Sequence, residues 1–96
     1  MSVTVVYNFD AAQGKAGALL EVIQKARDFA LTVTGCEAFD VYQGQEDPHK
    51  FVMIERWASV EAHRAHFEKN VKGSGTLDTV LALMVAPPEG TYYLQR

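Results

Sequence analysis

The stretch FVMIERWASVEAHRAHF at residues 51–67 decides the fold of this chain. Its first part, from Phe51 to Trp57, reads as an apolar strand whose side chains point alternately to opposite faces of a sheet. Ser59 follows directly and is a preferred N-cap, so a helix is expected to begin there. That helix carries His63 and His66. The stretch therefore predicts a strand that leads straight into a helix, with an indole and two imidazoles around one corner.

The rest of the chain surrounds this corner with regular elements. An alternating pattern predicts a strand over residues 3–10, and apolar residues spaced three and four apart predict an amphipathic helix over residues 14–33. The remaining expected elements are strands at 36–44, 51–58 and 91–95 and helices at 59–71 and 76–85. The order β-α-β-β-α-β is typical of the ferredoxin-like α+β fold with an antiparallel sheet. We expect a single domain over residues 1–96, a length that leaves no room for a second.

The central strands of this sheet are expected to be apolar on both faces. Right-handed crossovers place the first and third strands in the middle. Val52 and Ile54 then oppose Phe51, Met53 and Trp57, whereas a sheet with one wet face alternates cleanly. Helices cover only one face, so a second copy of the chain is the simplest cover for the other. The sequence predicts a homodimer through the sheet faces, because too few residues remain for a C-terminal segment to fold across the sheet instead.

Composition excludes several classes of partner. The chain has a net charge of −3 with acids and bases interspersed, so neither nucleic acid nor an anionic membrane is an expected partner. No apolar run approaches the ~20 residues of a spanning helix, and the first residues, MSVTVVYNFD, do not have the form of a signal peptide. Cys36 is the only cysteine, which excludes an internal disulfide. These features predict a cytoplasmic protein.

Residues 35–67 also carry a resemblance to a known family. The features are a Gly-Cys pair opening the second strand, an Asp-Pro hairpin, Glu-Arg-Trp ending the third strand, and Ser-x-Glu-Ala-x-x-x-His at the helix start. Together they resemble the antibiotic biosynthesis monooxygenase (ABM) family of dimeric α+β barrels. That family includes quinol oxygenases, haem-degrading oxygenases and an isomerase. The resemblance implies the fold more specifically than it implies the reaction.

In the quinol-oxygenating members the resemblance implies a reaction without metal, flavin or haem. A phenol or quinol loses a proton in a pocket between sheet and helices and then reacts with O₂ directly. Trp57 matches the family's indole at the end of the third strand. Met53 stands where the best-known members have an asparagine, and His63 stands where they have a tyrosine. His63 is the expected proton acceptor, since an imidazole titrates near neutral pH.

The side-chain periods of a strand and of a helix predict how these groups meet. Met53, Glu55 and Trp57 project from one strand face, and burying Phe67 requires the following helix to fold back over that face, which brings His63 over the strand end. A buried carboxylate needs a partner, so Glu55 is expected to meet either a helix histidine or an arginine. The predicted site has His63 and Trp57 as catalytic residues. Its pocket residues are Met53, Glu55, His66, Phe67 and Asn8.

No cofactor is expected. His63 and His66 share a helical face, but the closest acids, Glu61 and Glu68, do not point with both rings, so a metal site is not predicted. Haem-degrading relatives have a tryptophan on the second helix and a histidine ten residues later. His66 and Thr76 stand at those positions here. The expected partners are a small-molecule substrate and O₂.

Three functions remain open at this stage. The first is cofactor-independent oxygenation of a small aromatic or quinol-type substrate. The second is another pocket chemistry on the same fold, such as isomerisation. The third is a non-catalytic dimeric module that binds a small molecule.

Overall fold

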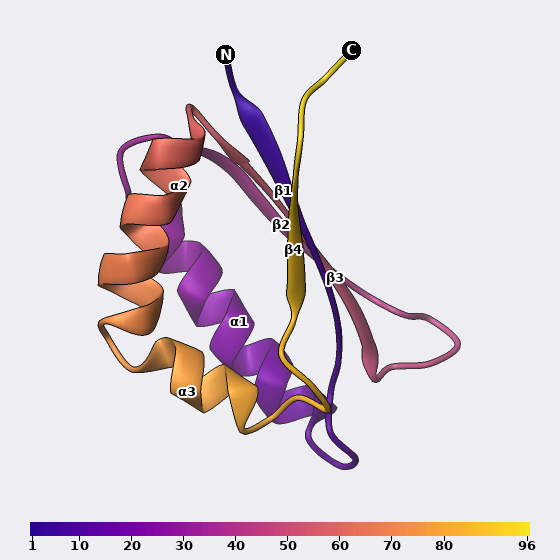
Figure 1. Ribbon diagram of the computed structural model, residues 1–96. Coiled ribbons are helices and arrows are strands. Elements are labelled where there is room, and N and C mark those ends of the chain that lie inside the picture. Colours follow the sequence, from indigo (N-terminus) through magenta and orange to yellow (C-terminus); the bar gives the residue numbers. More distant parts are fainter.

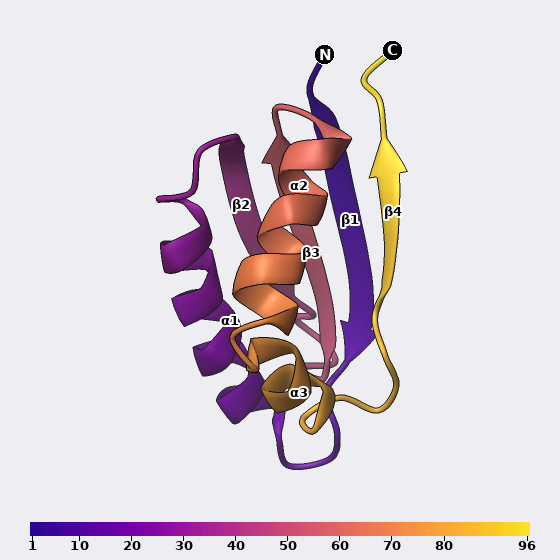
Figure 2. The ribbon, with the colours of Figure 1, turned by 60° about the vertical axis from the view of Figure 1, so that its left-hand side comes forward.

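The computed structural model describes residues 1–96 and contains one four-stranded sheet covered by helices. The helices all lie on one face of the sheet, and the N- and C-terminal ends lie at the same end of it (Figures 1 and 2). The elements in chain order are β1 (Val3–Asp10), α1 (Ala16–Ala30), β2 (Cys36–Gln43), β3 (Lys50–Trp57), α2 (Val60–His66), the π-helical segment η1 (Phe67–Lys72), α3 (Thr76–Leu81) and β4 (Glu89–Tyr93).

The sheet has the predicted topology. Its strand order is β2-β3-β1-β4 and all pairs are antiparallel, so the first and third strands are central as expected. This is the predicted ferredoxin-like α+β fold. The sheet is open at β2 and β4, so one chain alone forms no closed barrel.

The covered face of the sheet carries the core. Rows of side chains from β1 and β3 meet there in register, and the rings of Phe9 and Phe51 stack with centroids 5.5 Å apart. Leu19 and Ile23 of α1 pack onto this layer and are fully buried. The larger buried cluster comprises Phe9, Ala11, Leu19, Ile23, Ala30, Phe39, Phe51 and Val80, and a smaller one beneath α2 comprises Val3, Val5 and Trp57.

The second half of the chain departs from the predicted helix limits. Ser59 caps α2 as predicted, accepting a hydrogen bond from the backbone N–H of Ala62. The α-helix was expected to reach residue 71 but ends at His66, and a π-helical segment follows. In it the N–H of Gly73 bonds to the carbonyl of Glu68, five residues back. A side chain at Gly73 would lie 2.7 Å from the carbonyl oxygen of Lys69, so the wider turn closes on a residue without one.

The last elements are also shifted. The short helix expected at 76–85 ends at Leu81, because the residues after it bond to the end of β1: the N–H of Val85 donates to Asp10, and Ala12 donates to Leu83. β4 begins at Glu89, two residues before the expected strand, and is held by pairing with residues 4–8 of β1. The long helix is likewise shorter than predicted: it begins at Ala16, and after Ala30 the N–H groups of Thr32 and Val33 bond to carbonyls only three residues back.

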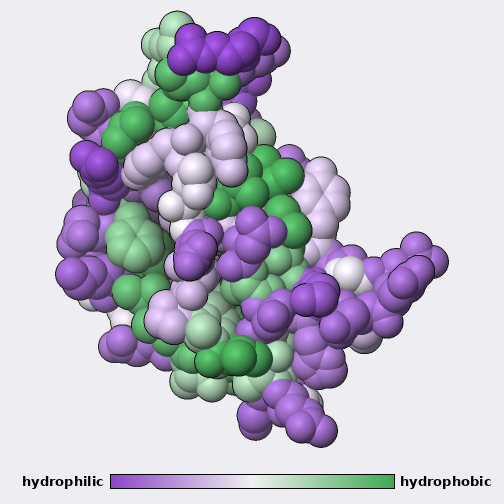
Figure 3. All heavy atoms as spheres, turned by 45° about the vertical axis from the view of Figure 1, so that its right-hand side comes forward, coloured by the Kyte–Doolittle hydropathy of each residue, from purple (hydrophilic) through white to green (hydrophobic).

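The other face of the sheet has no helix over it. Val6, Val52 and Ile54 project from the two central strands on this side and are only partly buried. Figure 3 shows several apolar areas on this side of the molecule, separated by polar side chains, with a polar arm projecting beside them. The predicted two-sided apolar character of the central strands is therefore present. None of the helices combines the length and the apolar character that crossing a bilayer requires.

The packing of α1 on the sheet predicts a large loss of folding stability when the side chain of Leu19, which is 0% exposed, is truncated. Leu19→Ala should lower the free energy of unfolding by about 2–5 kcal/mol, because it removes buried methyl groups and leaves a cavity. Urea denaturation followed by circular dichroism measures this. Leu31→Ala is the matched control: Leu31 is 49% exposed at the end of the same helix, so its loss should stay near 0.5 kcal/mol. Equal losses in the two variants would contradict the described packing.

Candidate active site

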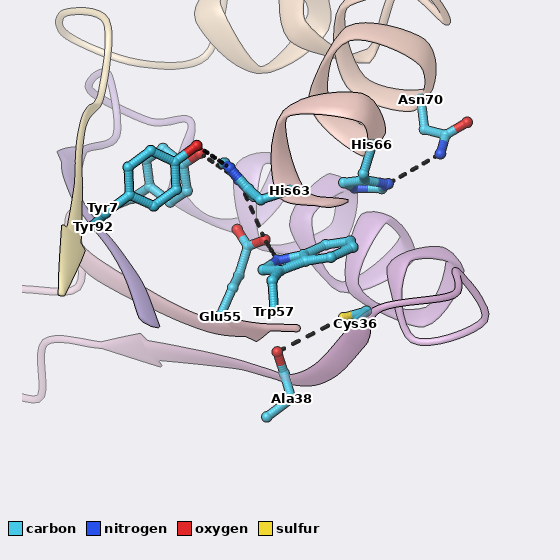
Figure 4. A network of polar contacts seen from close by, with 9 residues as sticks. All are labelled: Tyr7, Cys36, Ala38, Glu55, Trp57, His63, His66, Asn70 and Tyr92. Atoms are coloured by element: carbon cyan, nitrogen blue, oxygen red, sulfur yellow. Dashed lines mark hydrogen bonds and ion pairs between the residues drawn. The ribbon is translucent and has the colours of Figure 1, made fainter. Parts of the chain in front are cut away.

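His63 lies at the centre of a buried polar group beneath α2. It is 5% exposed. Its Nε2 lies 3.1 Å from the hydroxyl of Tyr7 on β1, and its Nδ1 lies 2.8 Å from the hydroxyl of Tyr92 on β4. Figure 4 shows the two phenol rings approaching the imidazole from one side while the Trp57 indole lies on the other. Both ring nitrogens of His63 therefore have a hydroxyl partner.

Glu55 supplies a buried carboxyl group to the same place. It is 3% exposed and projects from β3 between Phe39 and Val5 of the neighbouring strands. The indole N–H of Trp57 donates a 2.9 Å hydrogen bond to its Oε1, and the same oxygen lies 3.9 Å from Nε2 of His63. Sequence analysis foresaw a histidine or an arginine as its partner; the histidine is near, and the closest donor is the indole two residues along the strand.

Burial sets the charge state of this pair. Desolvation raises the pKa of Glu55 to about 7, although the hydrogen bond from Trp57 works in the opposite direction. Desolvation, with repulsion from His66 and Arg64, lowers the pKa of His63 to about 4. A carboxyl group with the higher pKa keeps its proton in preference to the imidazole, so near neutral pH His63 is neutral and the two form no ion pair. A neutral imidazole is the form that accepts a proton.

The two tyrosines make His63 a proton carrier between hydroxyl groups. A neutral imidazole has one N–H and one bare nitrogen, so one tyrosine hydroxyl accepts a hydrogen bond from it and the other donates. Burial, with the charges of Glu55 and Tyr92, raises the pKa of Tyr7, which therefore remains a phenol. A proton arriving at the hydroxyl that donates to the bare nitrogen has a continuous path to the imidazole, and the tautomer decides which tyrosine this is.

The Trp57 side chain packs against the residues of this buried polar group. It is 0% exposed. Its rings lie 4.8 Å from the His66 ring at an angle of 30°, and 5.7 Å from the His63 ring at 65°. His66 in turn is 3.0 Å from the amide nitrogen of Asn70, and burial lowers the pKa of this histidine. The indole thus fixes Glu55 and both imidazoles in place.

Two adjoining hollows give access to the group. A small inner cavity of about 80 Å³ lies between sheet and helices, and a groove of about 560 Å³ opens beside it between α2, α3 and β4. They share Tyr7, His63, Phe67, Leu77 and Pro88. The groove falls within the size range of small-molecule sites, roughly 300–1,000 Å³. Its remaining lining residues are Val5, Arg64, Glu68, Leu81, Pro87, Gly90 and Tyr92.

Most predicted site residues meet here, with two exceptions. The inner cavity is lined by Met53, Glu55, His63, His66 and Phe67, as expected from the strand and helix periods. Trp57 was expected to share a cavity with His63 but lines neither hollow, because Glu55 and the two imidazoles cover it.

Asn8 was expected at the edge of this cavity and lies elsewhere. It pairs with Val52 on the uncovered face of the sheet and is exposed. The side-chain period of a strand explains the error. Asn8 follows Tyr7 directly, so the two point to opposite faces, and Tyr7 faces the helices.

Sequence analysis missed both tyrosines. Tyr7 shares the covered face of β1 with Val5 and Phe9, and that alternation was a usable signal. Tyr92 was not predictable in the same way, because its place opposite Val5 depends on the register of β4. Gly90 makes room for the Tyr7 ring: a side chain there would approach a carbon of that ring to 2.5 Å.

Other reactive groups do not join the site. No group of three or more His, Cys, Asp and Glu side chains is arranged to hold a metal ion. Cys36 is partly exposed; its thiol lies 3.8 Å from the carbonyl oxygen of Ala38, and desolvation is the largest cause of its raised pKa. A raised pKa keeps the thiol protonated and weakly nucleophilic.

Comparison with known proteins gives one family match and several structural neighbours. The model of the antibiotic biosynthesis monooxygenase family matches residues 2–70. A Nitrosomonas europaea protein is 23% identical, with a TM-score of 0.88 over 98% of this chain and 89% of that one. A PA3566 structure from Pseudomonas aeruginosa is 24% identical, with a TM-score of 0.83 over 99% and 94%. At these identities the likeness shows the fold alone.

A third neighbour carries a named activity. A variant of SnoaB, a cofactor-independent oxygenase from Streptomyces nogalater, is 18% identical, with a TM-score of 0.86 over 99% of this chain and 93% of that one. No curated protein sequence matches this chain.

The buried carboxyl group predicts a specific pH dependence of stability. Because the pKa of Glu55 rises from 4.5 to about 7 on folding, the folded state holds this proton more tightly, and its contribution to stability is lost as pH rises from 4.5 through 7. Glu55→Gln removes that loss while retaining an oxygen for the indole N–H. The difference in unfolding free energy, wild type minus variant, should fall by up to about 3 kcal/mol between pH 4.5 and pH 8.

Urea denaturation at several pH values measures this difference. The same substitution at the exposed Glu61 controls for the change in net charge and should follow the wild type. Wild-type and Glu55→Gln curves that stay parallel across this range would rule out the raised pKa.

Proposed function

Because this chain belongs to the antibiotic biosynthesis monooxygenase family, matched over residues 2–70, we propose that it is a cofactor-independent monooxygenase of a small phenol or quinol. The observation that carries the proposal is the buried, neutral His63 held between two tyrosine hydroxyls at the wall of an apolar groove. An apolar pocket with one convergent polar group is the usual form of a site for such a ligand.

The first step is removal of the substrate's hydroxyl proton. Both nitrogens of His63 are occupied by tyrosines, so the substrate hydroxyl donates to Tyr7 or Tyr92, whose own proton moves on to the imidazole. The imidazolium that forms lies 3.9 Å from Oε1 of Glu55. An ionised carboxylate at that distance stabilises the imidazolium, most strongly where water is excluded.

The electrons for the second step come from the substrate. A phenolate is electron-rich enough to reduce O₂ once it has lost its proton. One oxygen atom becomes a carbonyl on the ring carbon, and the other takes the hydrogen of that carbon and the hydroxyl proton and leaves as water. A phenol thus becomes a quinone, a four-electron oxidation that matches the four electrons needed by O₂. The balance needs no reduced cofactor.

Glu55 and Trp57 have different roles in this proposal. Glu55 is the charge partner of His63. Trp57 is a positioning residue, since it touches the carboxyl group and both imidazoles but lines neither hollow. Met53 and Phe67 form apolar walls, and His66 lies at the inner edge.

The working form in this proposal is a homodimer with the two sheets face to face. The uncovered face carries Val6, Val52 and Ile54 on its central strands, and water contact with such a surface costs free energy in proportion to its apolar area. A stable pair needs roughly 800 Å² per partner. The second copy lies behind the sheet, away from the groove.

Oxygen uptake tests the proposed reaction. Wild-type protein should consume O₂ with at least one member of a panel of phenols, naphthols and quinols and release the corresponding quinone. His63→Ala should lower the rate by about 10²–10⁴-fold, the usual contribution of a general base, and Tyr7→Phe should lower it as well. Circular dichroism and sedimentation establish that each variant remains folded.

Two results would replace this function by another. Conversion of a panel member without O₂ uptake would indicate isomerase-like chemistry. Ligand-induced thermal shifts without any turnover would indicate a binding module. Turnover that survives both His63→Ala and Trp57→Phe unchanged would place the site elsewhere.

The proposed dimer predicts the effect of a charge on the uncovered face. Ile54→Lys should shift the protein to monomer or aggregate at micromolar concentration, because two buried ammonium groups would face one apolar surface. Sedimentation velocity measures the change. Leu31→Lys, a charge on the helix side, should leave the dimer intact. A wild-type protein that is entirely monomeric at this concentration would overturn the proposed assembly.

A further inference from the structure

We propose that the substrate carries a carboxylate, which Arg64 binds at the rim of the groove while the hydroxyl group reaches the tyrosines. The part of this inference that concerns the substrate hydroxyl rests on the proposed function. The carboxylate site itself rests on the groove alone. It defines the substrate class as a hydroxylated aromatic acid.

Arg64 is placed over the same tyrosine that holds His63. Its guanidinium carbon lies 5.8 Å from the centroid of the Tyr92 ring, within range of a cation–π contact. The hydroxyl of that ring is the one bonded to Nδ1 of His63. The guanidinium therefore lies over this phenol ring while the imidazole bonds to its hydroxyl, and both line the groove.

The charges in the groove leave the guanidinium available. Arg64 is exposed and has no carboxylate within 4.0 Å, whereas Arg27 and Arg56 each pair with an acid. The acid lining the groove is Glu68, and it lies 3.8 Å from Lys72. Tyr7 and His63 are neutral near pH 7, so the free fixed charge at this wall is positive. A planar guanidinium binds a carboxylate through two parallel hydrogen bonds, which suits it to this ligand.

The spacing fits a flat aromatic acid. The Tyr92 centroid is 5.4 Å from the His63 ring and 5.8 Å from the Arg64 guanidinium, so laid end to end these distances limit the separation to 11.2 Å. An aromatic acid with a hydroxyl at one end and a carboxylate at the other, on one ring or two fused rings, fits within this upper limit. Between the two polar ends the groove offers Val5, Phe67, Leu77 and Pro88 to the rings.

Binding of a redox-stable matched pair tests this without any turnover. The probes are 6-hydroxy-2-naphthoate and its methyl ester, which differ only in the charge at the far end from the hydroxyl. Fluorescence titration should show the acid binding about 10-fold or more tightly than the ester, the scale of a hydrogen bond to a charged group. In Arg64→Gln the preference should fall to about 1–2-fold with ester affinity unchanged. Glu68→Gln should strengthen binding of the acid.

Lys69→Gln is the matched control, because it removes a positive charge from the same helical segment but neither from the groove lining nor from the Lys72–Glu68 pair; it should keep the preference. Equal wild-type affinity for the two probes, or a preference that survives Arg64→Gln, would overturn the inference. The outcome is independent of the proposed reaction. If the preference for the acid is lost in Arg64→Gln but no hydroxylated acid causes O₂ uptake, the inferred ligand class stands and the proposed oxygenase activity is rejected. If neutral quinols cause O₂ uptake and the protein shows no preference for the acid, the oxygenase activity stands and the inferred carboxylate site is rejected.

Discussion

The hydrogen bond from the Trp57 indole to the Glu55 carboxyl group, 2.9 Å long, holds together the buried polar group on which the site depends. A carboxyl group on the covered face of a sheet is costly unless a donor meets it. Here the donor is two residues along the same strand, so the strand alone brings the two groups together. The indole rings then give α2 a flat surface on which both histidines pack, and the strand-to-helix corner becomes a rigid support for His63.

Exclusion of water from this support determines its chemistry. Desolvation acts in opposite directions on an acid and a base, raising the pKa of Glu55 to about 7 and lowering that of His63 to about 4. Near neutral pH the Glu55 carboxyl group is therefore about half protonated, while the imidazole remains a free base. A histidine on the surface would be partly protonated near neutral pH. Under α2 it is neutral and bonded to two hydroxyls, and in the proposed reaction this is the form that receives the proton of the phenol.

The two faces of the sheet have different roles in this short chain. The covered face holds the polar group and its groove, while the other face presents Val6, Val52 and Ile54 without a helix over them. In the proposed assembly the second copy supplies the missing apolar contacts. The helices are then free to leave a hollow, because the core does not have to be filled completely to stabilise the chain. The π-helical segment after His66 contributes two of the residues around this hollow. Phe67 lines the hollow, and Asn70 bonds to His66.

The sequence by itself determined the element order, the strand order and most of the corner. Alternation placed Met53, Glu55 and Trp57 on one face, and the Ser59 cap set where α2 begins. These features depend on neighbours in the chain, so local periodicity is sufficient to predict them.

Tertiary structure alone decided which groups complete the site. Tyr92 meets His63 only through the register of β4 against β1, and Gly90 permits it by leaving space for Tyr7. Asn8 was misplaced because a one-residue step on a strand reverses the face. The neutral state of His63 also had no signal in the sequence, since it follows from how many atoms from distant strands and helices exclude water around it.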